Sequence, residues 1–197
     1  LNYELNDALS IRLFENFNSY KTGLDGAAFT DDLDYTTRNK NSLTGLALKY
    51  KKDGLTWHFL GSYQHLNRLT VDDSTHKGSP WYNYAKGDYT GNTANLESYI
   101  NLPFSKKLEL VAGLQYINQQ SDQSYLSISD YGPYETKIDG DSVTINNYAA
   151  YASVLLKDQS NFNLEIGGRF NYHSRYGSNG TFTFNPSYVF DDHVKIF

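Results

Sequence analysis

Apolar and polar side chains alternate along most of this chain with a period of two residues. Between Leu55 and Gln64, every second side chain is apolar or small, and most of those between are polar. Successive side chains of a β-strand point to opposite faces, so this period predicts strands with one apolar and one polar face. The same alternation recurs over 108–117, 147–156, 162–173 and 181–190.

The alternating segments predict eight long strands, followed by the start of a ninth at Lys195. The eight ranges are 8–21, 43–51, 55–66, 93–102, 108–119, 146–156, 162–174 and 180–190. Strands of about ten residues are long for a soluble sheet but suit a tilted crossing of a membrane. Two residues fit the pattern poorly. Glu15 falls on the apolar face, which predicts either a bulge or a position above the lipid, and Pro186 falls inside a strand.

The predicted connections alternate between short and longer ones. The short ones are 51–54, 103–107, 157–161 and 191–194, and the others are 22–42, 67–92, 120–145 and 175–179. In an up-and-down sheet, alternate connections lie at opposite ends. Barrels of bacterial outer membranes have short periplasmic turns and longer extracellular loops, and the chain follows that rule.

Aromatic residues on the apolar face provide a second test of a membrane barrel. One group is predicted near the periplasmic end: Tyr50, Trp57, Phe162, Tyr188 and Phe190. Another group is predicted near the outer end: Tyr63, Tyr116, Tyr148, Phe170, Tyr172 and Phe182. Between them lie smaller aliphatic side chains: Leu46, Leu48, Leu110, Ala112, Ala152, Val154, Leu164 and Ile166. Two aromatic girdles around an aliphatic band are typical of outer-membrane barrels.

Composition narrows the class of protein further. No segment approaches the roughly 18 apolar residues of a membrane-spanning helix. The 18 tyrosines suit a surface where a ring meets apolar matter and its hydroxyl meets water. A net charge of −5 argues against a nucleic-acid partner. Cysteine is absent, which removes disulfides and thiolate chemistry.

Three segments resemble a known family of barrels. They are 108–124, 146–169 and 162–197, and they include the stretches Gly167-Gly168-Arg169 and Phe184-Asn185-Pro186-Ser187. These segments look like the barrel of TonB-dependent outer-membrane receptors, especially the group that is similar to the cobalamin receptor. The resemblance is good from about residue 93 to 197. It rests on strand and turn motifs, so it says almost nothing about which ligand is bound.

The resemblance implies a barrel of 22 strands that encloses an N-terminal plug domain. We therefore expect an all-β fold, an antiparallel up-and-down transmembrane β-barrel fragment of about eight to nine strands. Residues 1–197 would be part of the barrel domain, with the plug domain absent. The implied location is the outer membrane of a Gram-negative bacterium. The implied partners are membrane lipid, a large scarce nutrient such as a corrinoid or an iron-siderophore, the plug, and through it a TonB-type energy coupler. No cofactor is expected.

The sequence does not favour an enzyme. The five histidines are scattered without a zinc-binding spacing, and the nucleophile elbow and the phosphate loop are both missing. Two other readings stay open. One is a complete eight-stranded outer-membrane barrel with a structural or adhesion role. The other is a soluble β-barrel that binds an apolar ligand inside.

Aromatic residues in the predicted loops are the candidate ligand-binding residues. They are Trp81, Tyr82, Tyr84, Tyr89, Tyr131 and Tyr134. Rigid amphipathic rings supply contact area at a low entropic cost, and binding residues concentrate on loops. Packing of the loops against each other is an equally weighted explanation, since tyrosine also does that.

Two polar sets complete the candidates. Aspartates cluster at 31–34, at 72–73 and at 139–141, and such oxygen ligands could hold Ca²⁺. No cluster has the EF-hand spacing, so solvated loop charge is the favoured reading and no metal site is predicted.

The polar strand face is expected to line a lumen, against water or the plug. Its members are Glu97, Glu109, Gln115, Asn163, Glu165, Arg169 and Asn171.

Overall fold

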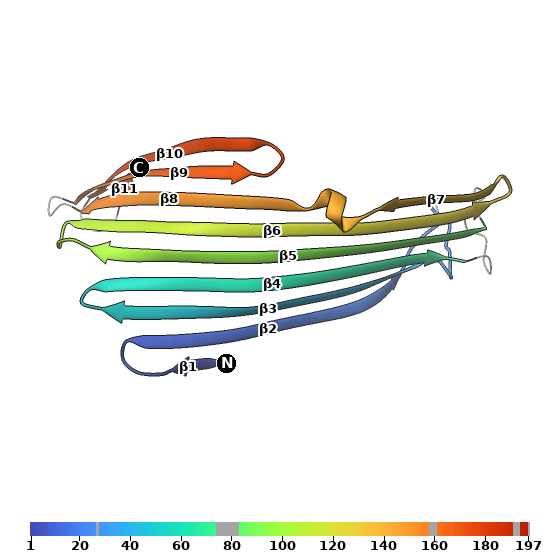
Figure 1. The fold of residues 1–197 in the computed structure, drawn as a ribbon, viewed down its shortest axis with the longest axis horizontal. Coiled ribbons are helices and arrows are strands. Elements are labelled where there is room, and N and C mark those ends of the chain that lie inside the picture. The colour runs from blue at the N-terminus through green and yellow to red at the C-terminus, as the bar shows by residue number, and fades with distance from the viewer. Residues whose placement is uncertain (27, 74–82, 158–160, 191–193, 197) are drawn as a thin grey trace.

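The computed structural model describes the chain except for residues 27, 74–82, 158–160, 191–193 and 197. Its strands form one antiparallel sheet in the order β1-β2-β3-β4-β5-β6-β8-β9-β10-β11, and β7 pairs with β6 beside that path. The long strands lie side by side (Figure 1), and in the pairing order β1 is at one edge and β11 at the other.

The long strands are much as the alternation predicts. They are β2 (Leu9–Gly23), β3 (Thr36–Lys52), β4 (Leu55–Asp72), β5 (Tyr84–Pro103), β6 (Leu108–Ser129), β8 (Ile145–Lys157), β9 (Phe162–His173) and β10 (Gly177–Phe190). The short elements are β1 (Asn2–Glu4), β7 (Gly132–Ile138), β11 (Val194–Ile196) and a 3-10 turn, η1 (Gly140–Val143). Within the described ranges, no helix is long and apolar enough to cross a membrane.

The strand prediction is confirmed for the fold class and for all eight long strands, and β11 is the predicted ninth. The prediction was wrong about the length of three connections. Much of 22–42, 67–92 and 120–145 is strand, because β3 to β6 continue past the predicted ends and β6 folds back into β7. These extensions lie at the end of the sheet opposite the short turns (Figure 1). There both faces meet water, so the alternation that marks a strand disappears from the sequence.

The register keeps the two faces separate. β2 pairs with β3 without interruption from Leu9 to Gly23, so Glu15 stays on the apolar face and the bulge prediction is wrong. Glu15 lies opposite Thr44, which in turn pairs with Tyr63 of the outer aromatic group. Pro186 pairs with Leu164, and β11 covers β10 only from 188 to 190, so the proline lies where its missing N–H costs little.

The sheet has almost no hydrophobic core. Among the described residues, Ala85 is the only buried hydrophobic one, and no side chain is completely buried. The accessible surface is 13671 Å², whereas a compact protein of 22.4 kDa would expose about 9,400 Å². Leu114 on the apolar face is 64% exposed. A single-layer sheet with such an exposed apolar face is stable only where something other than water covers that face.

A polar boundary crosses the apolar face near its outer end. Tyr116, Tyr148 and Tyr172 pair in register on β6, β8 and β9, with ring centroids 5.0 and 6.3 Å apart. Above them on the same face, Asn146 accepts hydrogen bonds from the Tyr116 hydroxyl and from Asn118, each at 2.9 Å. Rings that face carbon below and amides above are suited to a membrane interface.

The two faces of β8 provide a direct test of the lipid-facing assignment. Ala152 lies on the apolar face and Ala149 on the polar face of the same strand. We expect Ala152→Arg to lower the free energy of unfolding in lipid vesicles by about 2–4 kcal/mol, because a charge then meets hydrocarbon. Ala149→Arg should cost less, because its cross-strand partners Gln115 and Asn171 are polar and the new charge meets water instead of hydrocarbon. Urea unfolding, followed by a spectroscopic signal of the folded state, measures the free energy of unfolding of both variants. Equal losses would contradict the lipid-facing assignment.

Candidate functional site

Burial concentrates at the outer end of the polar face, where the connection 24–35 folds against the sheet. Of the described polar residues that are buried, four lie here, and Ala85 lies among them: Asp32, Thr37, Asn39 and Asp72. Leu24 donates its N–H to the Tyr35 carbonyl at 2.8 Å, which closes the connection at its base. We call this region the outer-end site.

Asp32 fixes the conformation of the connection. Its Oδ1 accepts the backbone N–H of Asp34 at 3.3 Å and that of Tyr35 at 3.1 Å. Aspartate side chains commonly replace the backbone acceptor in this way at turns. The result is that Tyr35 is presented toward β4 and β5.

A cavity of about 260 Å³ opens beneath the connection. Tyr35, Arg68, Tyr89 and Tyr125 supply its large side chains, from the connection, β4, β5 and β6 respectively. The Tyr89 ring bends over Gly87, where an added Cβ would lie 2.7 Å from ring carbon Cε2. Burial, and after it the negative charge of Asp72, raises the pKa of Tyr35 above its usual value, because both disfavour the ionised phenolate. The cavity therefore combines three phenol rings with one guanidinium.

Three carboxylates meet beside this cavity. One oxygen each from Asp32, Asp34 and Asp72 lies within 4.8 Å of the others. Asp32 is 6% and Asp72 is 3% exposed, so the reading as solvated loop charge is wrong for these two, whereas Asp34 is half-buried. They are the residues of the described chain that could hold a metal ion, and an oxygen-only set of this kind suits Ca²⁺ or Mg²⁺.

Lower on the polar face, Arg169 ties three strands together. Its Nη2 donates to Gln115 Oε1 and its Nε to Asn171 Oδ1, both at 2.7 Å. Its guanidinium also lies 5.6 Å from the centre of the Tyr151 ring. Asn171 in turn donates to Asn179 at 3.0 Å, which extends the network to β10. Four of the predicted lumen residues thus form or adjoin one network.

Tyr151 crosses β6 to reach β5. Its hydroxyl donates to Glu97 Oε1 at 2.8 Å, and its ring passes over Gly113. A Cβ at Gly113 would lie 2.6 Å from the ring carbon Cζ and 2.7 Å from Tyr99 Cβ. Only glycine leaves room for this crossing.

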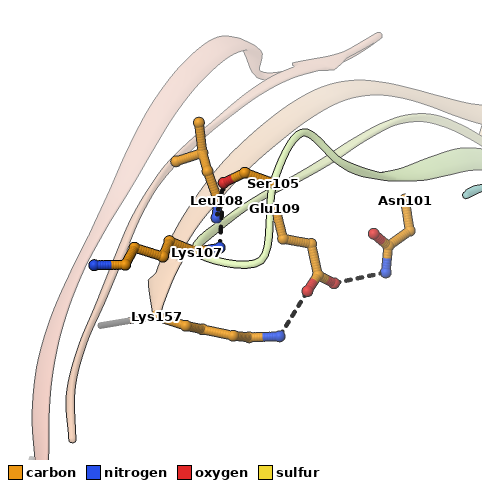
Figure 2. Close-up of polar contacts among 6 residues, drawn as sticks. All are labelled: Asn101, Ser105, Lys107, Leu108, Glu109 and Lys157. Atoms are coloured by element: carbon orange, nitrogen blue, oxygen red, sulfur yellow. Dashed lines mark hydrogen bonds and ion pairs between the residues drawn. The ribbon is translucent and has the colours of Figure 1, made fainter. Parts of the chain in front are cut away.

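The turn end of the polar face is held by an ion pair (Figure 2). Lys157 donates to Glu109 at 2.7 Å, and Asn101 donates to the other oxygen of the same carboxylate at 2.7 Å. The β5–β6 turn is closed by the Ser105 hydroxyl, which accepts the N–H groups of Lys107 and Leu108. These contacts join β5, β6 and β8. Because the charged groups are in direct contact, ordinary salt concentrations screen their attraction only in part.

The predicted ligand residues are placed unevenly. Tyr89 lines the outer-end cavity. Tyr84 begins β5, Tyr131 lies fully exposed at the β6–β7 turn, and Tyr134 packs with Tyr125 at a ring distance of 6.5 Å. The remaining two predictions, Trp81 and Tyr82, lie outside the described residues.

Sequence reasoning missed Tyr35, Arg68 and Tyr125 as members of the site. Arg68 and Tyr125 fell in ranges predicted to be loops. Continuing the period of two from the neighbouring strands would have placed both on the polar face with Tyr89.

Comparisons with known proteins agree with this architecture. Residues 2–196 match the family described as "TonB dependent receptor-like, beta-barrel". A comparison with curated proteins finds no match. The fold is similar to that of the ferric yersiniabactin uptake receptor FyuA from Yersinia pestis, with a TM-score of 0.66, 13% identity, and coverage of 91% of this chain and 31% of FyuA. The copper transporter OprC aligns at 12% identity, a TM-score of 0.36 and coverage of 92% and 38%. The chain thus spans less than a third of FyuA, and that likeness supports the fold alone.

The crossing of Tyr151 over Gly113 predicts a sharp response to one methyl group. We expect Gly113→Ala to push the ring away, break the bond to Glu97, and lower the free energy of unfolding by about 1–3 kcal/mol. Gly91→Ala is the matched control on the same face, because its Cβ would meet open space apart from Leu66 at 4.0 Å. Chemical unfolding of both variants decides the matter, and an unchanged Gly113→Ala protein would rule out the crossing.

The anchoring of the connection 24–35 by Asp32 is testable separately. Without the carboxylate, the N–H groups of Asp34 and Tyr35 lose their acceptor, so Asp32→Ala should speed their hydrogen exchange about tenfold. The exposed neighbour Asp31 is the control, and Asp31→Ala should leave exchange unchanged. Equal exchange in the two variants would contradict the anchor.

Proposed function

Because the chain belongs to the TonB-dependent receptor β-barrel family, we propose that it forms part of the wall of an importer for a large, scarce nutrient of the corrinoid or iron-siderophore type. The family consists of transporters of the Gram-negative outer membrane. The observation that supports the ligand proposal is the outer-end site. It lies on the polar face, beyond the tyrosine boundary, where a solute arriving from outside would first meet the wall.

The chemistry of the outer-end cavity suits a ligand with both flat and anionic parts. Tyr35, Tyr89 and Tyr125 offer ring faces and hydroxyls, which give contact area with little loss of side-chain entropy. Arg68 offers a planar set of N–H donors for a carboxylate, phosphate or similar oxyanion. The cavity is smaller than a corrinoid or a siderophore, so it would hold one part of the ligand while other loops hold the rest.

The polar face lower down would meet the plug domain. Arg169, Glu97 and the amides around them present charged and polar groups that a plug surface could continue. In this proposal the plug, moved by a TonB-type energy coupler, releases the ligand inward. The barrel wall itself stays rigid, which its cross-strand network favours.

The other two readings receive less support. A complete eight-stranded barrel requires pairing between the first and last strands, and within the described residues β1 and β2 do not pair with β10 or β11. A soluble barrel would bury its apolar side chains, whereas Leu114, Phe170 and Phe182 are exposed.

Ligand capture by the outer-end site can be tested in the intact receptor that carries this chain. The purified receptor would be screened for binding of cobalamin and a set of ferric siderophores by isothermal titration. For the ligand that binds, Arg68→Ala should weaken affinity at least about tenfold, as the loss of a charged hydrogen bond does. Arg38→Ala is the control, since Arg38 is exposed and its cross-strand partner, Leu69, has the parity of the apolar face.

The two parts of the proposal fail separately. Absence of binding to every corrinoid and siderophore would overturn the ligand class. Tight binding that Arg68→Ala leaves unchanged would keep the importer and reject the outer-end site.

A further inference from the structure

A second concavity lies on the opposite, apolar face, below the tyrosine boundary. It has a volume of about 430 Å³ and runs across β5, β6, β8 and β9. Its floor is formed by Ser98, Leu114 and Ala150, which pair with one another in register. Phe59, Leu96 and Phe170 stand around it. We call it the lipid-side groove.

The groove exists because small side chains interrupt a surface of large ones. Ser98 and Ala150 flank Leu114 on either side, so two short side chains lie between the rings of Phe59 and Phe170. The one hydroxyl on the floor belongs to Ser98, whose Oγ accepts the indole N–H of Trp57 at 2.9 Å, and the other side chains of the floor are aliphatic. What the groove offers to an occupant is therefore carbon.

The outer end of the groove is amphipathic. Tyr116, Tyr148 and Tyr172 all line it and form the boundary described above. Tyr116 donates a hydrogen bond from its hydroxyl to Asn146. The hydroxyls of Tyr148 and Tyr172 make no hydrogen bond to the part of the chain that the structure describes, so they remain available to polar groups just above the groove. An occupant should therefore be apolar below and rich in oxygen above.

We propose that the lipid-side groove holds one acyl chain of an outer-leaflet glycolipid, whose sugar or phosphate oxygens accept hydrogen bonds from Tyr148 and Tyr172. The groove lies on the apolar face, and its tyrosines close it on the side away from the short turns, which is the outer-leaflet side of such a barrel. The inference rests on the outer-membrane location that the family implies and is independent of which nutrient is imported.

Two alanines on β8 make a matched test. Ala150 lines the groove, whereas Ala152, two residues along the same exposed face, does not. Ala150→Phe should fill the groove, and Ala152→Phe should add the same ring beside it. The intact receptor would be incubated with lipid A or with phosphatidylethanolamine, exchanged into detergent, and examined by native mass spectrometry.

We expect the unaltered receptor and Ala152→Phe to retain one lipid A, and Ala150→Phe to retain about tenfold less, since several methylene contacts are lost. The double variant Tyr148→Phe/Tyr172→Phe should weaken retention while leaving the groove open. Absence of retained lipid A in the unaltered receptor, preference for phosphatidylethanolamine, a lipid-free dimer through this face, or equal effects of the two alanine variants would each overturn the proposal.

Discussion

A sheet of one layer has to satisfy two environments at once, and the rest of this structure depends on that requirement. Every strand carries one set of side chains toward each face, and the register keeps the sets apart over as many as 20 paired residues, as between β5 and β6. Neither face is buried by the chain itself. The apolar face is thus stable only against hydrocarbon, and the polar face only against water or another polar surface.

Without a core, the sheet is stiffened by side chains that reach across strands. Arg169 spans from β9 to β6 and Tyr151 from β8 to β5, and each ends on an amide or carboxylate acceptor. Such contacts hold the strands of this sheet in place, as side-chain packing does in the core of a globular domain. They also explain why a glycine at 113 is more restrictive than one at 91, since only the former lies under a crossing ring.

The sequence was informative only where the two environments differ. Across the membrane, lipid on one side and water on the other impose the period of two, so strands such as β8 and β9 could be predicted within a residue or two. Beyond the tyrosine boundary, both sides meet water and the contrast vanishes. Arg68 and Tyr125 were therefore assigned to loops although they belong to strands. The meeting of Asp32 with Asp72 could not be predicted either, because it depends on how the connection 24–35 folds back, which no local pattern encodes.

The same contrast explains why buried carboxylates and a cavity lined by aromatic rings collect at the outer end. Within the membrane, the face on which a side chain lies is decided by whether it must meet lipid or water. This requirement leaves little freedom to choose residues for ligand recognition. Above it, a connection can fold inward without exposing its backbone polar groups to lipid, and this is where Asp72, Ala85 and Thr37 become buried. Burying carboxylates such as those of Asp32 and Asp72 is costly in a chain with so little other burial. Polar burial that is concentrated at the outer end, with Ser187 as the one exception among the described residues, is more readily explained by recognition than by stability.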